Sequence, residues 1–273
     1  MAVMLQSSTA VAMLCCGFAA SGVLSLPVGL SLLLGADLGS ALVVRVLSFD
    51  LGWLVPAFLF AGGVMHLKLR GQKVRETGRM VLGVGFILLS LKLIGEATHP
   101  IRDSALLPSL SSYLADDYLT AFLIGALFTW IVHSSVAAVL MIAAFAGQGL
   151  VPLEAGVPLL LGANLGSGLI AFWLSRGMPP EARRIPVSNL LFRLAGAIAA
   201  LVVAGTIGLP VGLLGADHGV ALVNLHVAFN ACLLCLCFPF TGAMSRLTQA
   251  LLPDAASDKD DGGFARPASA LDR

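Results

Sequence analysis

The chain has 273 residues, of which 58% are hydrophobic and 11% are charged, and its formal net charge is +1. Soluble domains carry about 25% charged residues, so this composition excludes an ordinary soluble domain. Charge near zero without a basic stripe also gives no reason to expect a nucleic-acid partner.

The apolar runs reach or approach the length expected of membrane-spanning elements, because a helical span needs about 20 mostly apolar residues. In chain order the runs are Pro27–Val44, Leu51–His66, Met80–Leu91, Leu119–Gly147, Leu153–Ser175, Ile185–Leu209 and Gly219–Phe240. The sequence therefore predicts an all-α polytopic protein of the lipid bilayer. The final stretch, 253–273, is rich in Asp, Ala, Ser and Gly and is predicted to be a disordered tail.

An internal duplication is the most informative pattern. Gln6–Ser40 realigns without a gap on His133–Ser167 at a constant offset of 127 residues, with 16 of 35 positions identical. Each copy opens on a paired-serine motif, QSSTA or HSSVA, and closes on a glycine motif, GADLGS or GANLGS. Duplication with polar, glycine-rich breaks in apolar stretches is typical of secondary transporters, whose substrate site lies between the repeats.

The basic residues predict the topology. They crowd two connections, one from Lys68 to Arg79 and one from Arg176 to Arg184, and the positive-inside rule places both in the cytoplasm. The run Met80–Leu91 crosses outward from the first connection, so two further full crossings, by Leu119–Gly147 and Leu153–Ser175, would put the second connection outside. The 29 residues of Leu119–Gly147 would measure about 43 Å as one helix, which exceeds the ~30 Å hydrocarbon core.

We therefore expect that segment to fold as a re-entrant hairpin with its tip at the polar motif that starts at His133. The first copy then has the opposite orientation, so the fold is predicted to contain two inverted repeats. Residues 1–79 form the first repeat, 80–252 form the second with its lead-in and C-terminal helices, and 253–273 form the tail. The C-terminus is expected in the cytoplasm.

The two motifs suit ion and oxyanion binding. A break in a helix exposes N–H groups that attract an anion and carbonyls that attract a cation, and serine hydroxyls donate and accept hydrogen bonds. Glycines let a backbone unwind or approach a neighbour, so a broken transmembrane helix is predicted in each repeat. The candidate substrate- and ion-binding residues are Gln6, Ser7, Ser8, Thr9, Asp37, His133, Ser134, Ser135, Gly162, Asn164, Gly166 and Ser167. Alternatively, paired serines bond the preceding turn or pack helix on helix.

Arg193 lies inside an apolar run. An arginine at such a depth is paired with another group, faces an aqueous cavity or snorkels to the membrane surface. Two roles are therefore open for Arg193, attraction of an anion and snorkelling. Two stretches share a pattern, Asn189-x-x-Phe192-Arg193 and His226-x-x-Phe229-Asn230. Packing and hydrogen-bonding roles are expected for their Asn and His residues.

These residues carry a family resemblance. QSSTA, the stretch 133–168, EARRIPVSNLLFR, NLHVAFN and GVGFILLSLKLIGEATHPIRDS resemble the type II sodium/phosphate cotransporter family over roughly residues 1–245. The resemblance implies inverted repeats with re-entrant hairpins, inorganic phosphate as substrate, Na⁺ as coupling ion and no other cofactor. The matching site positions are Gln6, Ser7, Ser8, Ser134, Ser135, Gly162, Asn164 and Gly166.

Several positions depart from the family pattern. The family usually has Gln at His133, a third Ser at Thr9 and Val136, Asn at Asp37, and His and Asn at Asn189 and Arg193. Counterparts of the opening helices of its first repeat are expected to be missing.

Two function classes follow. The first is a sodium-coupled secondary transporter that takes up phosphate, or another small oxyanion, across a bacterial inner membrane by alternating access. A homo-oligomer is compatible with this class. The second is a transport-inactive truncated paralogue or regulatory membrane subunit. An enzyme is not expected, because the sequence has no carboxylate pair, nucleophile–base arrangement or metal cluster.

Overall fold

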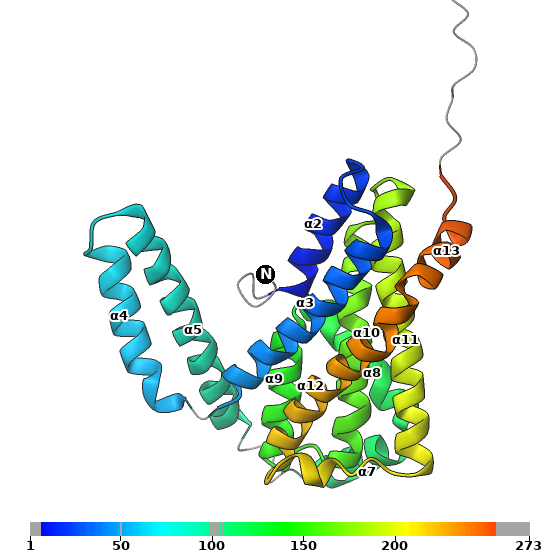
Figure 1. Ribbon diagram of the computed structural model, residues 1–273. Coiled ribbons are helices and arrows are strands. Elements are labelled where there is room, and N and C mark those ends of the chain that lie inside the picture. Colours follow the sequence, from blue (N-terminus) through cyan, green and yellow to red (C-terminus); the bar gives the residue numbers. More distant parts are fainter. Residues whose placement is uncertain (1–6, 50, 99–103, 105, 255–273) are drawn as a thin grey trace, which may run out of the picture.

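The computed structural model describes residues 7–49, 51–98, 104 and 106–254, and every regular element in these ranges is a helix (Figure 1). Five helical segments have the length and apolar character of a membrane span, as expected for a polytopic membrane protein. The elements are α2 (Ser8–Ala20), α3 (Leu26–Leu47), the 3-10 turn η1 (Gly52–Leu54), α4 (Val55–Leu67), α5 (Gln72–Ala97), α7 (Leu106–Asp116), α8 (Tyr118–Val132), α9 (Ser135–Gly147), α10 (Leu153–Leu174), α11 (Pro180–Thr206), η2 (Val211–Leu214), α12 (His218–Cys237), η3 (Phe238–Phe240) and α13 (Thr241–Leu251).

The duplicated sequence folds into a duplicated structural unit. Helices α2 and α9 each have 13 residues, α3 and α10 each have 22, and their bounds differ by the sequence offset, since 8 + 127 = 135 and 26 + 127 = 153. Ser7 and Ser134 cap the two short helices in the same extended conformation. The turns that follow contain Gly22 and Gly149, with φ of 73° and 74°. In Figure 1, α2 runs from mid-height toward the α13 end, and α9 runs toward the α7 end. The inverted membrane orientation and the re-entrant hairpins stay predictions.

The predicted polar break is present. Helix α8 ends at Val132, His133 adopts the left-handed conformation with φ of 57°, and α9 begins at Ser135. At 1.5 Å per residue, α8 and α9 are about 22 and 20 Å long, and each is shorter than the ~30 Å hydrocarbon core. The segment Leu119–Gly147 is therefore two half-length helices rather than one span.

The prediction of a broken transmembrane helix at the glycine motifs is wrong, because α3 and α10 each run through their motif without interruption. A β-carbon added to Gly162 or Gly166 would collide with a backbone carbonyl of α8, and one added to Gly125 would collide with the Leu159 carbonyl of α10. The glycines of the second copy therefore allow two helix backbones to touch, a usual role for small residues in membrane helices.

The predicted basic connections are shorter than expected. Helix α5 begins at Gln72, so Lys73, Arg75 and Arg79 lie in its first turns, and α11 already includes Arg183 and Arg184. Lys and Arg are good helix formers, which explains why these residues extend the helices. The helices α4 and α5 form a hairpin that leans away from the remaining bundle (Figure 1).

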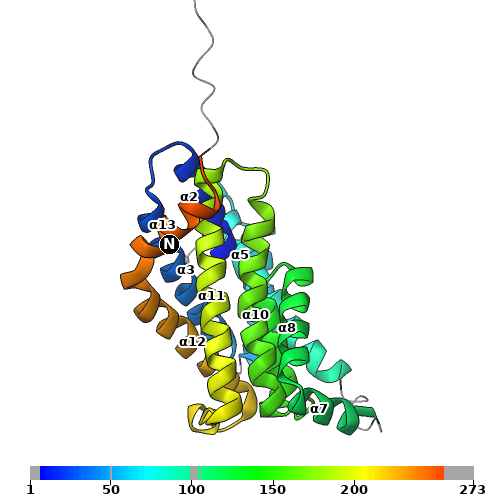
Figure 2. The ribbon, with the colours of Figure 1, turned by 90° about the vertical axis from the view of Figure 1, so that its right-hand side faces the viewer.

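The main apolar core lies in the bundle of α8, α9, α10, α11 and α12, with a second cluster where α2 packs on α3, α10 and α11. Figure 2 shows α10 and α11 side by side through the middle of this bundle. Residues 255–273 of the predicted tail lie outside the described residues, and the predicted repeat boundaries are not tested by the fold.

Candidate functional site

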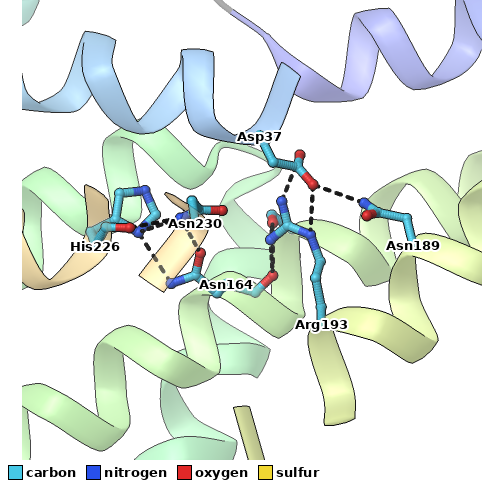
Figure 3. Close-up of polar contacts among 7 residues, drawn as sticks. Asp37, Asn164, Asn189, Arg193, His226 and Asn230 are labelled. Atoms are coloured by element: carbon cyan, nitrogen blue, oxygen red, sulfur yellow. Dashed lines mark hydrogen bonds and ion pairs between the residues drawn. The ribbon is translucent and has the colours of Figure 1, made fainter. Parts of the chain in front are cut away.

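A buried polar centre joins four helices in the middle of the bundle (Figure 3). Helix α3 contributes Asp37, α10 contributes Asn164 and Ser167, and α11 and α12 contribute two polar residues each, which are Asn189, Arg193, His226 and Asn230. Their exposed fractions range from 1% to 6%. Buried polar groups at this depth of an apolar bundle mark substrate or ion pathways more often than structural positions.

The charged half of the centre is formed by Asp37, Asn189 and Arg193. The guanidinium Nε donates to Asp37 Oδ2 at 3.1 Å, and Asn189 Nδ2 donates to the same oxygen at 2.9 Å. Arg193 Nη2 lies 2.6 Å from Asp37 Oδ1 as an ion pair, and within the described residues Oδ1 accepts no hydrogen bond. The paired alternative for Arg193 is the one observed, and its side chain is 4% exposed rather than snorkelling.

The neutral half of the centre is formed by Asn164, His226 and Asn230. Asn164 Nδ2 donates to His226 Nδ1 at 3.1 Å, and Asn230 Nδ2 donates to Asn164 Oδ1 at 3.0 Å. Because an amide NH₂ only donates, His226 accepts through Nδ1 in this arrangement. Asn230 Oδ1 is buried without a hydrogen-bond donor among the described residues.

The two halves are built on equivalent residues of the duplication, with partners from two helices of the second predicted repeat that share a sequence pattern. Asp37 and Asn164 occupy the same repeat position, because 37 + 127 = 164. Their partners occupy the same places in the shared pattern of α11 and α12, because 189 + 37 = 226 and 193 + 37 = 230. Each glycine-motif residue therefore receives one pair of side chains from a following helix, but only one of the two sets is charged.

Arg193 also links the two repeats. Its Nη1 donates to the backbone carbonyl of Asn164 and, at 2.7 Å, to Ser167 Oγ, while Nε and Nη2 face Asp37 of the first copy. Gly168 leaves room for this side chain, because an added β-carbon there would lie 3.1 Å from Arg193 Cδ. The guanidinium thus holds α3 and α10 together through α11.

The first serine motif reaches this centre. A cavity of about 10 Å³ is lined by Ser8, Thr9, Asp37, Ser167, Asn189 and Arg193, together with four apolar residues. A volume of roughly 10–15 Å³ admits one water molecule, so the site is closed to phosphate in this conformation. The N-terminus of α2, whose partial positive charge favours anions, lies at the wall of this cavity.

The other predicted residues lie elsewhere. Ser7 and Ser134 accept hydrogen bonds from Ala10 N at 3.1 Å and Ala137 N at 3.2 Å, so each side chain is the N-cap of the helix that follows it. Ser135 is the first residue of α9, and the exposed His133 ring contacts the Ile131 carbonyl.

Within the described residues, no hydrogen bond or ion pair joins the HSSVA motif to the buried centre. Gly162 and Gly166 contact α8, and Gln6 lies outside the described residues. The sequence predicted packing and hydrogen-bonding roles for Asn189, His226 and Asn230, and each does form a hydrogen bond with a residue of a glycine motif, which the sequence did not specify. The shared pattern in α11 and α12 was the signal for this arrangement.

Comparison with known proteins decides the family. The Na⁺/Pi-cotransporter family model matches residues 1–96 and 105–211. The chain belongs to the Na⁺/Pi-cotransporter family. The resemblance predicted from the motifs is therefore confirmed.

Similar members include YjbB of Escherichia coli K12, a protein named for a proposed role in inorganic phosphate export, which is 35% identical over 92% of this chain and 46% of its own length. YjbB of Salmonella typhimurium is 34% identical over the same shares. The chain thus spans about half the length of these relatives. YqeW of Bacillus subtilis, whose function is uncharacterised, is 24% identical over 91% of this chain and 81% of its own length. No solved structure matches the chain.

The family and the names of these relatives point to a membrane transporter rather than an enzyme. In this member of the family, the buried centre is the place where residues from both copies of the duplication meet.

Proposed function

We propose that this protein moves inorganic phosphate across the bacterial inner membrane by alternating access, with phosphate bound between the two repeats. The observation that carries the proposal is the meeting of equivalent repeat residues, Asp37 and Asn164, at one buried centre beside the N-terminus of α2. The family and the phosphate named in the relatives support this substrate.

Some residues around the small cavity can donate hydrogen bonds to an oxyanion, and others balance the charge of the site. The first N–H groups of α2 and the hydroxyls of Ser8 and Thr9 can donate to phosphate oxygens. The Asp37 carboxylate neutralises the nearby guanidinium of Arg193, so the site attracts the anion without holding it too tightly to release it. The cavity of about 10 Å³ must widen for phosphate to enter, and movement of one repeat against the other would open it to each side in turn.

Sodium coupling is the finer part of the proposal. The hydroxyls of the serine motifs are hard oxygen donors of the kind that a sodium ion uses, and an inward sodium gradient would drive uptake. Export is the second candidate direction, because YjbB relatives are named for it. Transport of another small oxyanion and a transport-inactive role are the remaining alternatives.

Labelled phosphate flux in proteoliposomes tests the proposal. Uptake is measured with an inward sodium gradient and with an equal potassium gradient, and efflux is measured from preloaded vesicles. Phosphate flux above that of empty liposomes, lowered in Ser8→Ala but not in Thr77→Ala, is expected. Thr77 is the control because its hydroxyl bonds the Lys73 carbonyl on the exposed face of α5. Equal flux in sodium and potassium would reject the coupling, and no flux in any arrangement would favour the inactive alternative.

A further inference from the structure

The guanidinium of Arg193 is surrounded by oxygen atoms. These are the two carboxylate oxygens of Asp37, the backbone carbonyl of Asn164 and the hydroxyl of Ser167. Carboxylate, carbonyl and hydroxyl oxygens from separate helices make up the donor set that proteins use for hard metal cations. Here the same set of oxygens surrounds the guanidinium of Arg193, which is a cation of the protein itself.

The buried charge of Asp37 also requires a cation at this place. The Asp37 carboxylate is 5% exposed, and a buried carboxylate needs a positive partner, because charging it in a low-dielectric environment is costly. Among the described residues Arg193 is the one cation that contacts Asp37. The side chains of Asn164, His226 and Asn230 are held by neutral hydrogen bonds, with no charged side chain among the three.

We propose that Arg193 is a tethered cation that permanently fills a cation site between the repeats, in the place that a freely exchanging sodium ion would otherwise take. The site needs no external cation for its charge balance. Any sodium dependence of the protein must then come from other positions. This inference goes beyond the proposed function and does not require that phosphate is the substrate.

Emptying the site should create a requirement for an external cation. Arg193→Ala keeps the oxygens of Asp37, Asn164 and Ser167 but removes the charge they surround. Thermal unfolding of the purified variant in detergent is measured in choline chloride and then with added sodium or guanidinium chloride at low millimolar concentration. With a cation at about 100 times its Kd, the linkage relation predicts a rise in Tm of about 5–10 °C, whereas wild type and Arg193→Lys should respond by less than a third of that.

The double variant Asp37→Asn, Arg193→Ala is the matched control, because it removes both charges and should lose the cation response. Asp37→Asn alone leaves the guanidinium unpaired and should reverse the sign of the requirement, so that its Tm rises with phosphate or sulfate instead. Arg184→Ala controls for the loss of a buried arginine, because its carboxylate partner Asp254 is 73% exposed.

If Arg193→Ala folds poorly in choline, the folded yield by size-exclusion chromatography replaces Tm, and rescue by sodium or guanidinium is the expected result. A cation response equal to that of wild type, or one that persists in the double variant, would overturn the inference. Since these readouts involve no transport, a failed flux experiment leaves this test intact.

Discussion

The contact between α8 and α10 gives a prediction that compares two equivalent glycines. Gly162 is buried, and a β-carbon added there would lie 2.8 Å from Phe122 C and 2.9 Å from Ala126 N, besides colliding with the Phe122 carbonyl oxygen. Its repeat counterpart Gly35 on α3 is exposed and has no atom within 4 Å of the added carbon. The same substitution, glycine to alanine, should therefore have opposite effects at the two positions.

The magnitudes follow from packing and helix propensity. In Gly162→Ala the obstructing atoms belong to backbone, which cannot rotate away as a side chain can, so α8 and α10 must separate by about 1 Å. Overpacking of this kind costs about 1–3 kcal/mol, and the alanine recovers about 1 kcal/mol of helix propensity. From the upper end of that range we expect a net loss of about 2 kcal/mol. Gly35→Ala lacks the collision and should gain up to about 1 kcal/mol.

Thermal unfolding of the two purified variants in the same detergent tests this difference. For a chain of this size about 1 kcal/mol shifts Tm by roughly 2–4 °C, so Gly162→Ala should fall by about 4–8 °C and Gly35→Ala should rise by about 2–4 °C. Gly166→Ala should behave like Gly162→Ala, because its β-carbon meets the Ala126 carbonyl. Equal shifts for Gly162→Ala and Gly35→Ala would refute the backbone contact as the reason for the glycine.

Two further predictions concern the hairpin tip and the end of α13. Ser134→Ala removes a helix cap, which costs about 1 kcal/mol, and, if the hydroxyl also binds substrate or ion, weakens the apparent affinity for it about 10- to 150-fold in flux measured over a range of concentrations. His133→Asn should preserve Tm whereas His133→Val should lower it, because β-branched residues disfavour the left-handed conformation seen there; equal Tm values would contradict that geometry. Arg184→Met should destabilise the protein, because the guanidinium donates to the C-cap carbonyl of α13 at 2.6 Å and to Asp254. The Arg184 hydrogen bond, and then its charge, lowers the pKa of Asp254 below its ordinary value of 3.8. The Asp254 part of the stabilisation is therefore present above pH 3.8 and is lost as the pH falls through the lowered pKa. The Tm difference between wild type and Arg184→Met should shrink on acidification, and a constant difference would exclude the ion pair as a contributor.

The sequence by itself determined the membrane class, the duplication, the break at His133 and the family. Each of these depends on information that is local or periodic along the chain: apolar runs long enough to span, two polar motifs in constant register, and residues that interrupt a helix. The helix bounds repeat at the same offset of 127 residues because the same local residues begin and end them. The shared pattern in α11 and α12 was also visible, but nothing in a linear pattern says which helix it faces.

Only the tertiary structure decided what the glycines and the buried charges contact. A glycine motif is compatible with an unwound helix and with a close helix crossing, and the choice depends on whether a neighbouring backbone is there, as α8 is for Gly162. Asp37 and Arg193 are 156 positions apart in the chain, so their pairing follows from the packing of α3 against α11. Because the interaction of two buried charges depends on their separation and shielding from water, sequence alone could place Arg193 in the membrane but could not identify its partner.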